Sequence, residues 1–86
     1  MKEYEKVLKA LANNRRLQII KYLKVKKTAT VSNISVHIKL SLKSTSKHLA
    51  VLFGAGIVEK DQKNLSMFYF ITSPLSKLAK QVIDII

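Results

Sequence analysis

The side chains best suited to chemistry in this sequence are Lys43, Ser44, Lys47 and His48, which lie in a segment of mixed polarity, residues 41–61. Two ammonium groups, a hydroxyl and an imidazole can donate hydrogen bonds to phosphate oxygens and to the edges of bases. The two lysines are four positions apart, as are the serine and the histidine, so all four share one face if the segment is helical. The pattern indicates a surface that binds a polyanion.

The positive charge of the chain is concentrated in the same part of the sequence. Lys and Arg number 16 against five Asp and Glu, which gives a formal net charge of +11. No acidic residue lies between Glu5 and Glu59, and eleven of the cations fall within residues 6–58. Such a block favours nucleic acid, because neutralising phosphates releases condensed counterions. The alternative is a lysine-rich surface that is merely solvated.

No group of residues has the composition of a catalytic or metal centre. Cysteine is absent, which excludes thiolate ligands and a cysteine nucleophile. His37 and His48 are isolated, and a metal site needs three or four convergent donors. No acid–base or nucleophile–base pair can be nominated. We therefore predict no enzyme activity, no metal and no cofactor. His37 is expected to be structural or exposed, and His48 either contacts DNA or only hydrogen-bonds at the edge of its helix.

Two helices are predicted before the polar segment. Apolar spacing indicates a first helix over residues 2–12. Asn13 is a good N-cap for a second helix, which ends before a polar connector at residues 24–30. The inward positions of this second helix are Leu17, Ile20 and Leu23, and the positions expected to face solvent are Arg15, Arg16 and Lys21.

A pair of short helices joined by a tight turn follows. Thr30 can cap a short helix that ends near Ile38, and Ser41 can cap the next helix, residues 42–53, across the turn of residues 39–41. Gly54 and Gly56 are expected to end that helix. Its predicted inner face consists of Leu42, Thr45, Leu49, Leu52 and Phe53.

The last third of the chain predicts a hairpin and a final helix. Residues 57–60 and 67–71 are β-like and are joined by a basic tip in which Asn64 tolerates a left-handed conformation. Ser73 and Pro74 have the order of an N-cap and a first helical residue. The apolar stripe of the final helix consists of Leu75, Leu78, Ala79, Val82, Ile83 and Ile86.

These elements predict a winged helix-turn-helix, mainly α with a small β-hairpin in the order α-α-α-α-β-β-α, formed by one domain over residues 1–86. No window approaches the ~18 apolar residues of a membrane span, and the N-terminus lacks the apolar core of a signal peptide. A cytoplasmic protein with no membrane partner is expected.

The sequence resembles the ArsR-type (arsenical-repressor-like) winged-helix regulators. LKALANNRRLQIIKYL, residues 8–23, is similar to the family's opening motif with its Arg-Leu pair. TVSNISVHIKLSLKSTSKHLAVLFGAGIV, residues 30–58, is similar to its helix-turn-helix, including Ser-x-His-Leu at 46–49 and the closing Ala-Gly-Ile-Val. Tyr69 matches the tyrosine of the wing. Together these motifs cover nearly the whole chain.

The resemblance implies a homodimer, built from the first and last helices, that represses transcription by occupying a palindromic operator in double-stranded DNA. Carried over by position, Lys43, Ser44, Lys47 and His48 belong to the recognition helix. The corresponding positions of the wing are Lys60, Gln62 and Lys63. The positions expected in the dimer interface are Tyr4, Val7, Leu8, Leu11, Leu78, Val82, Ile85 and Ile86.

The sequence departs from the family at several functional positions. Leu42 stands where glutamine is common, Lys43 replaces a small residue and Lys39 replaces a glycine, so base preference does not transfer. The metal-sensing members carry paired cysteines in the third helix or acidic residues and histidines in the last one. This chain offers only His37 and Asp84 there, which predicts a regulator without metal sensing and leaves its effector open.

Two other classes of protein remain as alternatives. Winged helices also serve as protein-interaction adaptors that do not read DNA, since a fold does not determine a function. An adaptor should expose an apolar groove where this chain has lysines and hydroxyls. A basic amphipathic membrane binder is less consistent with the sequence, because the cations lie away from the apolar stripe of the last helix.

Overall fold

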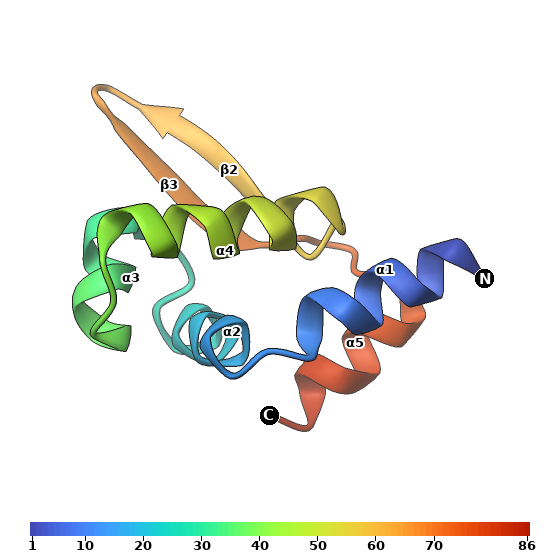
Figure 1. Ribbon diagram of the computed structural model, residues 1–86. Helices are drawn as coiled ribbons and strands as arrows, with labels where there is room; N and C mark the ends of the chain where they lie inside the picture. The colour runs from blue at the N-terminus through green and yellow to red at the C-terminus, as the bar shows by residue number, and fades with distance from the viewer.

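The computed structural model describes residues 1–86 and contains five helices and three strands (Figure 1). Their order along the chain is α1 (Lys2–Leu11), α2 (Asn14–Lys26), β1 (Ala29–Thr30), α3 (Val31–Ile38), α4 (Leu42–Gly54), β2 (Val58–Lys63), β3 (Ser66–Ile71) and α5 (Lys77–Asp84). The hairpin of β2 and β3 projects from the body as a wing beside α4, whereas α1 and α5 pack together at the opposite end (Figure 1). The predicted winged helix-turn-helix is confirmed. No helix has both the length and the apolar character needed to cross a membrane.

Short polar side chains begin three of the helices where the sequence predicts them. Asn13, Thr30 and Ser41 each have extended backbone, and each side-chain oxygen accepts a hydrogen bond from the backbone N–H three residues later. This bond satisfies one of the N–H groups that have no partner within the first turn of a helix. The starts of α2, α3 and α4 are therefore determined by local sequence.

The predicted start of the last helix is wrong. Ser76, rather than Ser73, is the N-cap of α5, and its hydroxyl accepts a hydrogen bond from the N–H of Ala79. Pro74 lies in the segment between β3 and α5, after a cis peptide bond with Ser73. Both serines satisfy the local capping preference, so the choice depends on packing: Ala79 and Ile83 are buried in the core.

The sheet has one strand more than the sequence predicts. Its order is β1-β3-β2, with both pairs antiparallel, and Ala29 and Thr30 pair with Tyr69 and Phe68. The connector predicted for residues 24–30 is therefore partly regular structure: its first three residues belong to the end of α2, and its last two form β1. The hairpin turn at Asn64 is confirmed, since this residue has a φ of 57°.

The core lies where α2 and α4 meet the base of the wing. Ile19, Ile20 and Leu23 of α2 are fully or almost fully buried, as are Leu49 and Leu52 of α4. The predicted inward set of α2 omits Ile19, the first of these buried residues. Contacts among all five helices and the sheet hold α4 in a fixed orientation, with its opposite side free.

The two ends of α4 differ from the prediction. Thr45, Leu49 and Leu52 are buried as expected, but Leu42 and Phe53 are 54% and 41% exposed. Both lie in the terminal turns of the helix, where fewer neighbouring elements cover the side chains. The chain reverses at Gly56, which has a φ of 73° that favours glycine, whereas Gly54 is still helical.

Candidate nucleic-acid interface

The turn between α3 and α4 fixes where α4 begins. Lys39 caps α3 with a left-handed backbone, φ 57° and ψ 52°, and its N–H donates to the carbonyls at the end of that helix. Two residues later Ser41 caps α4 by accepting from the N–H of Ser44. A short turn with one left-handed residue therefore places the first turn of α4 at the surface, as helix-turn-helix docking requires.

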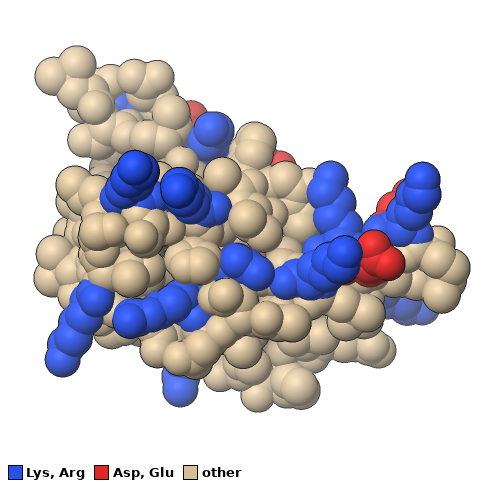
Figure 2. Space-filling view, viewed as in Figure 1, with Lys and Arg blue, Asp and Glu red and all other residues tan.

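The exposed face of α4 carries the cations that the sequence predicts. Lys43 and Lys47 are exposed, Ser44 is half-buried, and all three lie opposite the buried Thr45, Leu49 and Leu52. Lysine and arginine side chains are spread over the face that α4 presents in Figure 2, and acidic side chains are few there. This surface can contact a phosphate backbone and offer donors to base edges.

Arg16 does not extend into solvent as the sequence predicts. Its Nε and Nη2 donate to the carbonyls of Ala10, at 2.5 Å, and Lys9, at 3.1 Å, and its Nη1 lies 3.2 Å from Nδ1 of His48. The two carbonyls belong to the end of α1, where a cation also complements the helix dipole. One half-buried guanidinium therefore connects α1, α2 and α4.

Arg15 is likewise a structural side chain. Its guanidinium donates to the backbone carbonyl of Ile38, the last residue of α3. The prediction that both arginines face solvent is thus wrong, because their long side chains reach carbonyl groups at helix ends. The only signal in the sequence was the Arg-Leu pair of the family motif, which contains Arg16 but not Arg15. These two arginines connect α2 to α1, α3 and α4.

The network around His48 favours its neutral form and one tautomer. Burial lowers the pKa of His48 below its ordinary value of 6.5, and the nearby charges of Arg16 and Arg15 lower it further. A guanidinium only donates hydrogen bonds, so Nδ1 of His48 accepts and its ring proton is on Nε2. His48 therefore hydrogen-bonds at the edge of α4, and its Nε2–H remains as one further donor.

The three candidate residues of the wing do not form one patch. Lys60, Gln62 and Lys63 all lie on β2, opposite Tyr69, Met67 and Ser66 of β3 respectively. Because side chains alternate along a strand, the first two share a face and Lys63 belongs to the other. The ammonium of Lys60 lies 4.7 Å from the centre of the Phe53 ring, close to α4.

The wing as a whole carries no excess of positive charge. Its two lysines are matched by Glu59 and Asp61 on the same strand. Lys63 forms the last pair before the turn, at the tip of the hairpin that projects from the body of the protein (Figure 1). We therefore expect the wing to contribute less electrostatic attraction than α4.

The residues predicted for a dimer interface fall into three groups. Tyr4, Leu8 and Ile85 are exposed apolar side chains on α1 and at the end of α5, and Ile85 is 82% exposed. Val7 and Leu11 are buried in the core of the protomer, which leaves them little surface for a second chain. The half-buried remainder, packed against that core, consists of Leu78, Val82 and Ile86.

The histidines and acids do not converge on a metal site. No group of three or more His, Cys, Asp and Glu side chains is close enough to hold a metal ion. His37 instead stacks on Tyr22, with ring centroids 4.3 Å apart and an interplanar angle of 29°. The contact joins α3 to α2, which is a structural role for this histidine.

The fold and the position of the basic helix define a winged helix-turn-helix protein. The family of bacterial regulatory proteins known as the arsR family matches residues 13–60, from the cap of α2 to the middle of β2. This region includes the complete helix-turn-helix. The chain therefore belongs to the arsR family.

Relatives of known structure have the same arrangement. The transcriptional activator HlyU of Vibrio cholerae is 37% identical over 67 residues, which are 78% of this chain and about three fifths (61%) of that protein. Its reduced form has a TM-score of 0.82 at 32% identity, covering 96% of this chain and 83% of that one.

Two further structures are similar over almost the entire chain. The homodimeric winged helix-turn-helix DNA-binding domain of Mb0332 from Mycobacterium bovis has a TM-score of 0.83 at 27% identity, covering 98% of this chain and 74% of that one. The transcriptional repressor PagR of Bacillus anthracis has a TM-score of 0.82 at 25% identity, and the match covers 98% of this chain and 92% of PagR. The similarity extends from α1 to α5.

Proposed function

We propose that the protein is a sequence-specific double-stranded DNA-binding transcriptional regulator, with residues 1–86 acting as one DNA-binding domain. The observation that carries the proposal is the exposed, acid-free face of α4, with Lys43, Ser44 and Lys47 at the surface. Behind this face Arg16 connects α4 to α1, and Arg15 holds the end of α3. His48 and, on one face of the wing, Lys60 and Gln62 extend this surface, whereas Lys63 contacts DNA from its position beside the hairpin turn. Phosphates would bind the lysines, and the first turn of α4 would face the bases.

We further propose a homodimer that occupies a palindromic operator and acts as a repressor without a metal effector. The exposed Tyr4 and Leu8 on α1 and Ile85 after α5 support this pairing, because large apolar side chains grouped at one end favour association. The similar Mycobacterium bovis domain is homodimeric and PagR is a transcriptional repressor, and both properties are consistent with this proposal. A two-fold dimer places two copies of α4 on related half-sites.

The proposal is tested by selecting bound duplexes from a random pool and measuring their affinity against salt. A dimer that neutralises roughly 6–10 phosphates should lose about 10³–10⁵ in affinity between about 50 and 200 mM salt. A single enriched palindrome with this salt dependence supports the regulator. Failure to bind any duplex at low salt contradicts it and favours a protein-interaction adaptor.

A further inference from the structure

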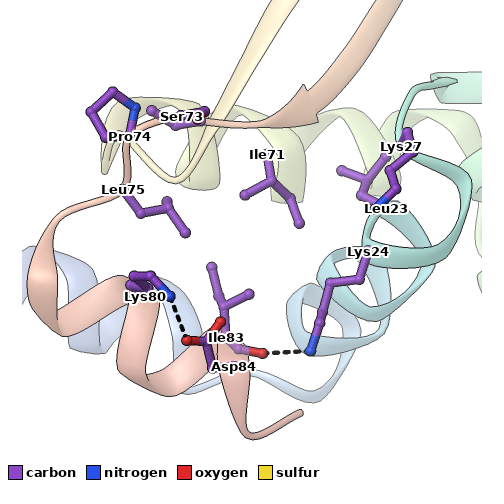
Figure 3. A pocket seen from close by; sticks show the side chains of 11 residues that line it. Leu23, Lys24, Lys27, Ile71, Ser73, Pro74, Leu75, Lys80, Ile83 and Asp84 are labelled. Carbon is purple, nitrogen blue, oxygen red and sulfur yellow. Dashed lines mark hydrogen bonds and ion pairs between the residues drawn. The ribbon is translucent and has the colours of Figure 1, made fainter.

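A hollow of about 500 Å³ opens between the end of α2 and α5. Its third wall is the end of β3 and the segment that leads from it to α5 (Figure 3). Sites for small molecules commonly have volumes of about 300–1,000 Å³. None of the residues proposed to contact DNA lines this hollow, so it is separate from the α4 surface.

The interior of the hollow is apolar. Ile71, Leu75 and Ile83 point into it from β3, from the following segment and from α5, and Leu23 adds to it from α2 (Figure 3). Leu23 and Ile83 belong to the core, so this surface is well supported. An aliphatic chain or an aromatic ring could displace water from these side chains favourably.

The rim of the hollow is cationic. Lys24 and Lys27 stand at the end of α2 and Lys80 on α5, against one carboxylate, Asp84. Lys24 Nζ donates to the carbonyl of Ile83 at 2.8 Å, and Lys80 Nζ lies 2.8 Å from Asp84 Oδ2 (Figure 3). An ammonium has three N–H groups, so both lysines retain donors for another acceptor. The excess of positive charge selects an anion.

A buried hydroxyl lies behind the same wall. Thr72, between Ile71 and the segment leading to α5, lines the hollow, and its Oγ1 is buried without a hydrogen-bond partner. Because this oxygen has almost no accessible surface, a ligand in the hollow does not contact it, and the lysines of the rim supply the polar contacts. The backbone N–H of Thr72 donates to the carbonyl of Ile57 at 2.9 Å, which connects this wall to the base of the wing.

We propose that this hollow binds a small organic acid, a carboxylate or sulfonate that carries an aliphatic chain or an aromatic ring. The acid group binds the lysines of the rim, and the apolar part lies against Ile71, Leu75 and Ile83. A bound acid bridges α2 and α5 and contacts the wall that reaches the wing. The inference stands without the DNA-binding proposal, and its test contains no DNA.

The first experiment measures binding of the fluorescent anion anilinonaphthalene sulfonate to the full chain. We expect saturable binding of one dye per chain, displaced by octanoate. Octylamine, which has the same chain length but the opposite charge, should not displace it. Absence of saturable binding, or equal competition by the acid and the amine, overturns the proposal.

The second experiment compares two double variants that each remove two positive charges. Lys24→Gln with Lys27→Gln should weaken dye and octanoate binding about tenfold, the size expected for losing charge-assisted hydrogen bonds. The matched control, Lys26→Gln with Lys77→Gln, changes exposed lysines of α2 and α5 outside the hollow and should leave affinity within about twofold. Equal losses in the two variants show binding by net charge alone and overturn the proposal.

Two single substitutions separate binding from folding. Asp84→Asn removes the carboxylate that competes for Lys80 and should strengthen octanoate binding about two- to threefold. Damage to the fold cannot produce that gain. Thr72→Val keeps the shape of the side chain and removes only the inaccessible hydroxyl, so octanoate affinity should stay within about twofold while the melting temperature stays the same or rises. A loss of affinity in Asp84→Asn contradicts the assigned contacts.

Discussion

Replacing Arg16 by alanine removes the side chain that connects three helices. The guanidinium donates to the carbonyls of Lys9 and Ala10 at the end of α1 and to the imidazole of His48 on α4. The bond to Lys9 is exposed and is screened by solvent, whereas the other two are partly buried. Those two bonds decide the size of the effect.

The expected loss of stability follows from those two bonds. A hydrogen bond contributes about 0.5–1.5 kcal/mol net, or about 1.5–3 kcal/mol when one partner is charged. After discounting for partial exposure, Arg16→Ala should lower the free energy of unfolding by about 2–3 kcal/mol. For a domain of this size, that is a decrease in melting temperature of about 8–24 °C.

Thermal and urea unfolding followed by circular dichroism measure this effect at a fixed protein concentration, since dimerisation would make the melting temperature depend on concentration. Lys21→Ala, which removes an exposed cation of α2, is the matched control and should change stability by less than about 0.5 kcal/mol. Arg16→Lys should be almost as destabilising as Arg16→Ala, because one ammonium group cannot form all the hydrogen bonds of the forked guanidinium. If Arg16→Ala is no more destabilising than Lys21→Ala, the helix-connecting role is refuted.

Three further predictions concern protonation, packing and metals. Folding lowers the pKa of His48 below 6.5, so the unfolded chain binds a proton on this residue more readily, and stability should decline as the pH falls below about 6.5. Nuclear magnetic resonance titration should show the lowered pKa of His48. The variant His48→Asn should lose the part of the decline that this residue causes. Thr45 Oγ1 is buried without a partner, so Thr45→Val should raise the free energy of unfolding by about 1 kcal/mol in urea denaturation, and a decrease would mean that the hydroxyl is satisfied. Zinc, nickel, cadmium or arsenite added to the protein–DNA complex should leave affinity unchanged in fluorescence anisotropy, whereas stoichiometric binding that releases DNA would reveal a metal site.

Local chemistry made much of the fold predictable. The caps Asn13, Thr30 and Ser41 bind N–H groups three residues away, so their effect is contained in a few residues of sequence. The left-handed turn at Asn64 is equally local. The lysines of α4 are exposed as predicted because helical periodicity assigns them to the side opposite Leu49.

Contacts between distant residues caused the errors. Strand β1 has two residues and depends on pairing with β3, almost forty positions later. Arg15 and Arg16 reach carbonyls at the ends of α3 and α1, which no periodicity in α2 can indicate. The start of α5 depends on burying Ala79 and Ile83, because Ser73 and Ser76 both have the local character of a cap. The hollow beside α5 is formed by the same long-range packing.

The central claim is that α4 reads base sequence while the wing lysine beside the turn contacts the backbone. The direct measurement is the ratio of affinity for the selected operator to affinity for a random duplex, in Lys43→Ala and in Lys63→Ala. If Lys43 contacts a guanine edge, Lys43→Ala should reduce this ratio by a factor that corresponds to about 1–3 kcal/mol of binding free energy. Lys63→Ala should instead weaken binding to both duplexes equally and lower the slope of affinity against salt by about one. Both residues are exposed, so circular dichroism should show intact folds. An unchanged ratio in Lys43→Ala together with a collapsed ratio in Lys63→Ala would contradict the account.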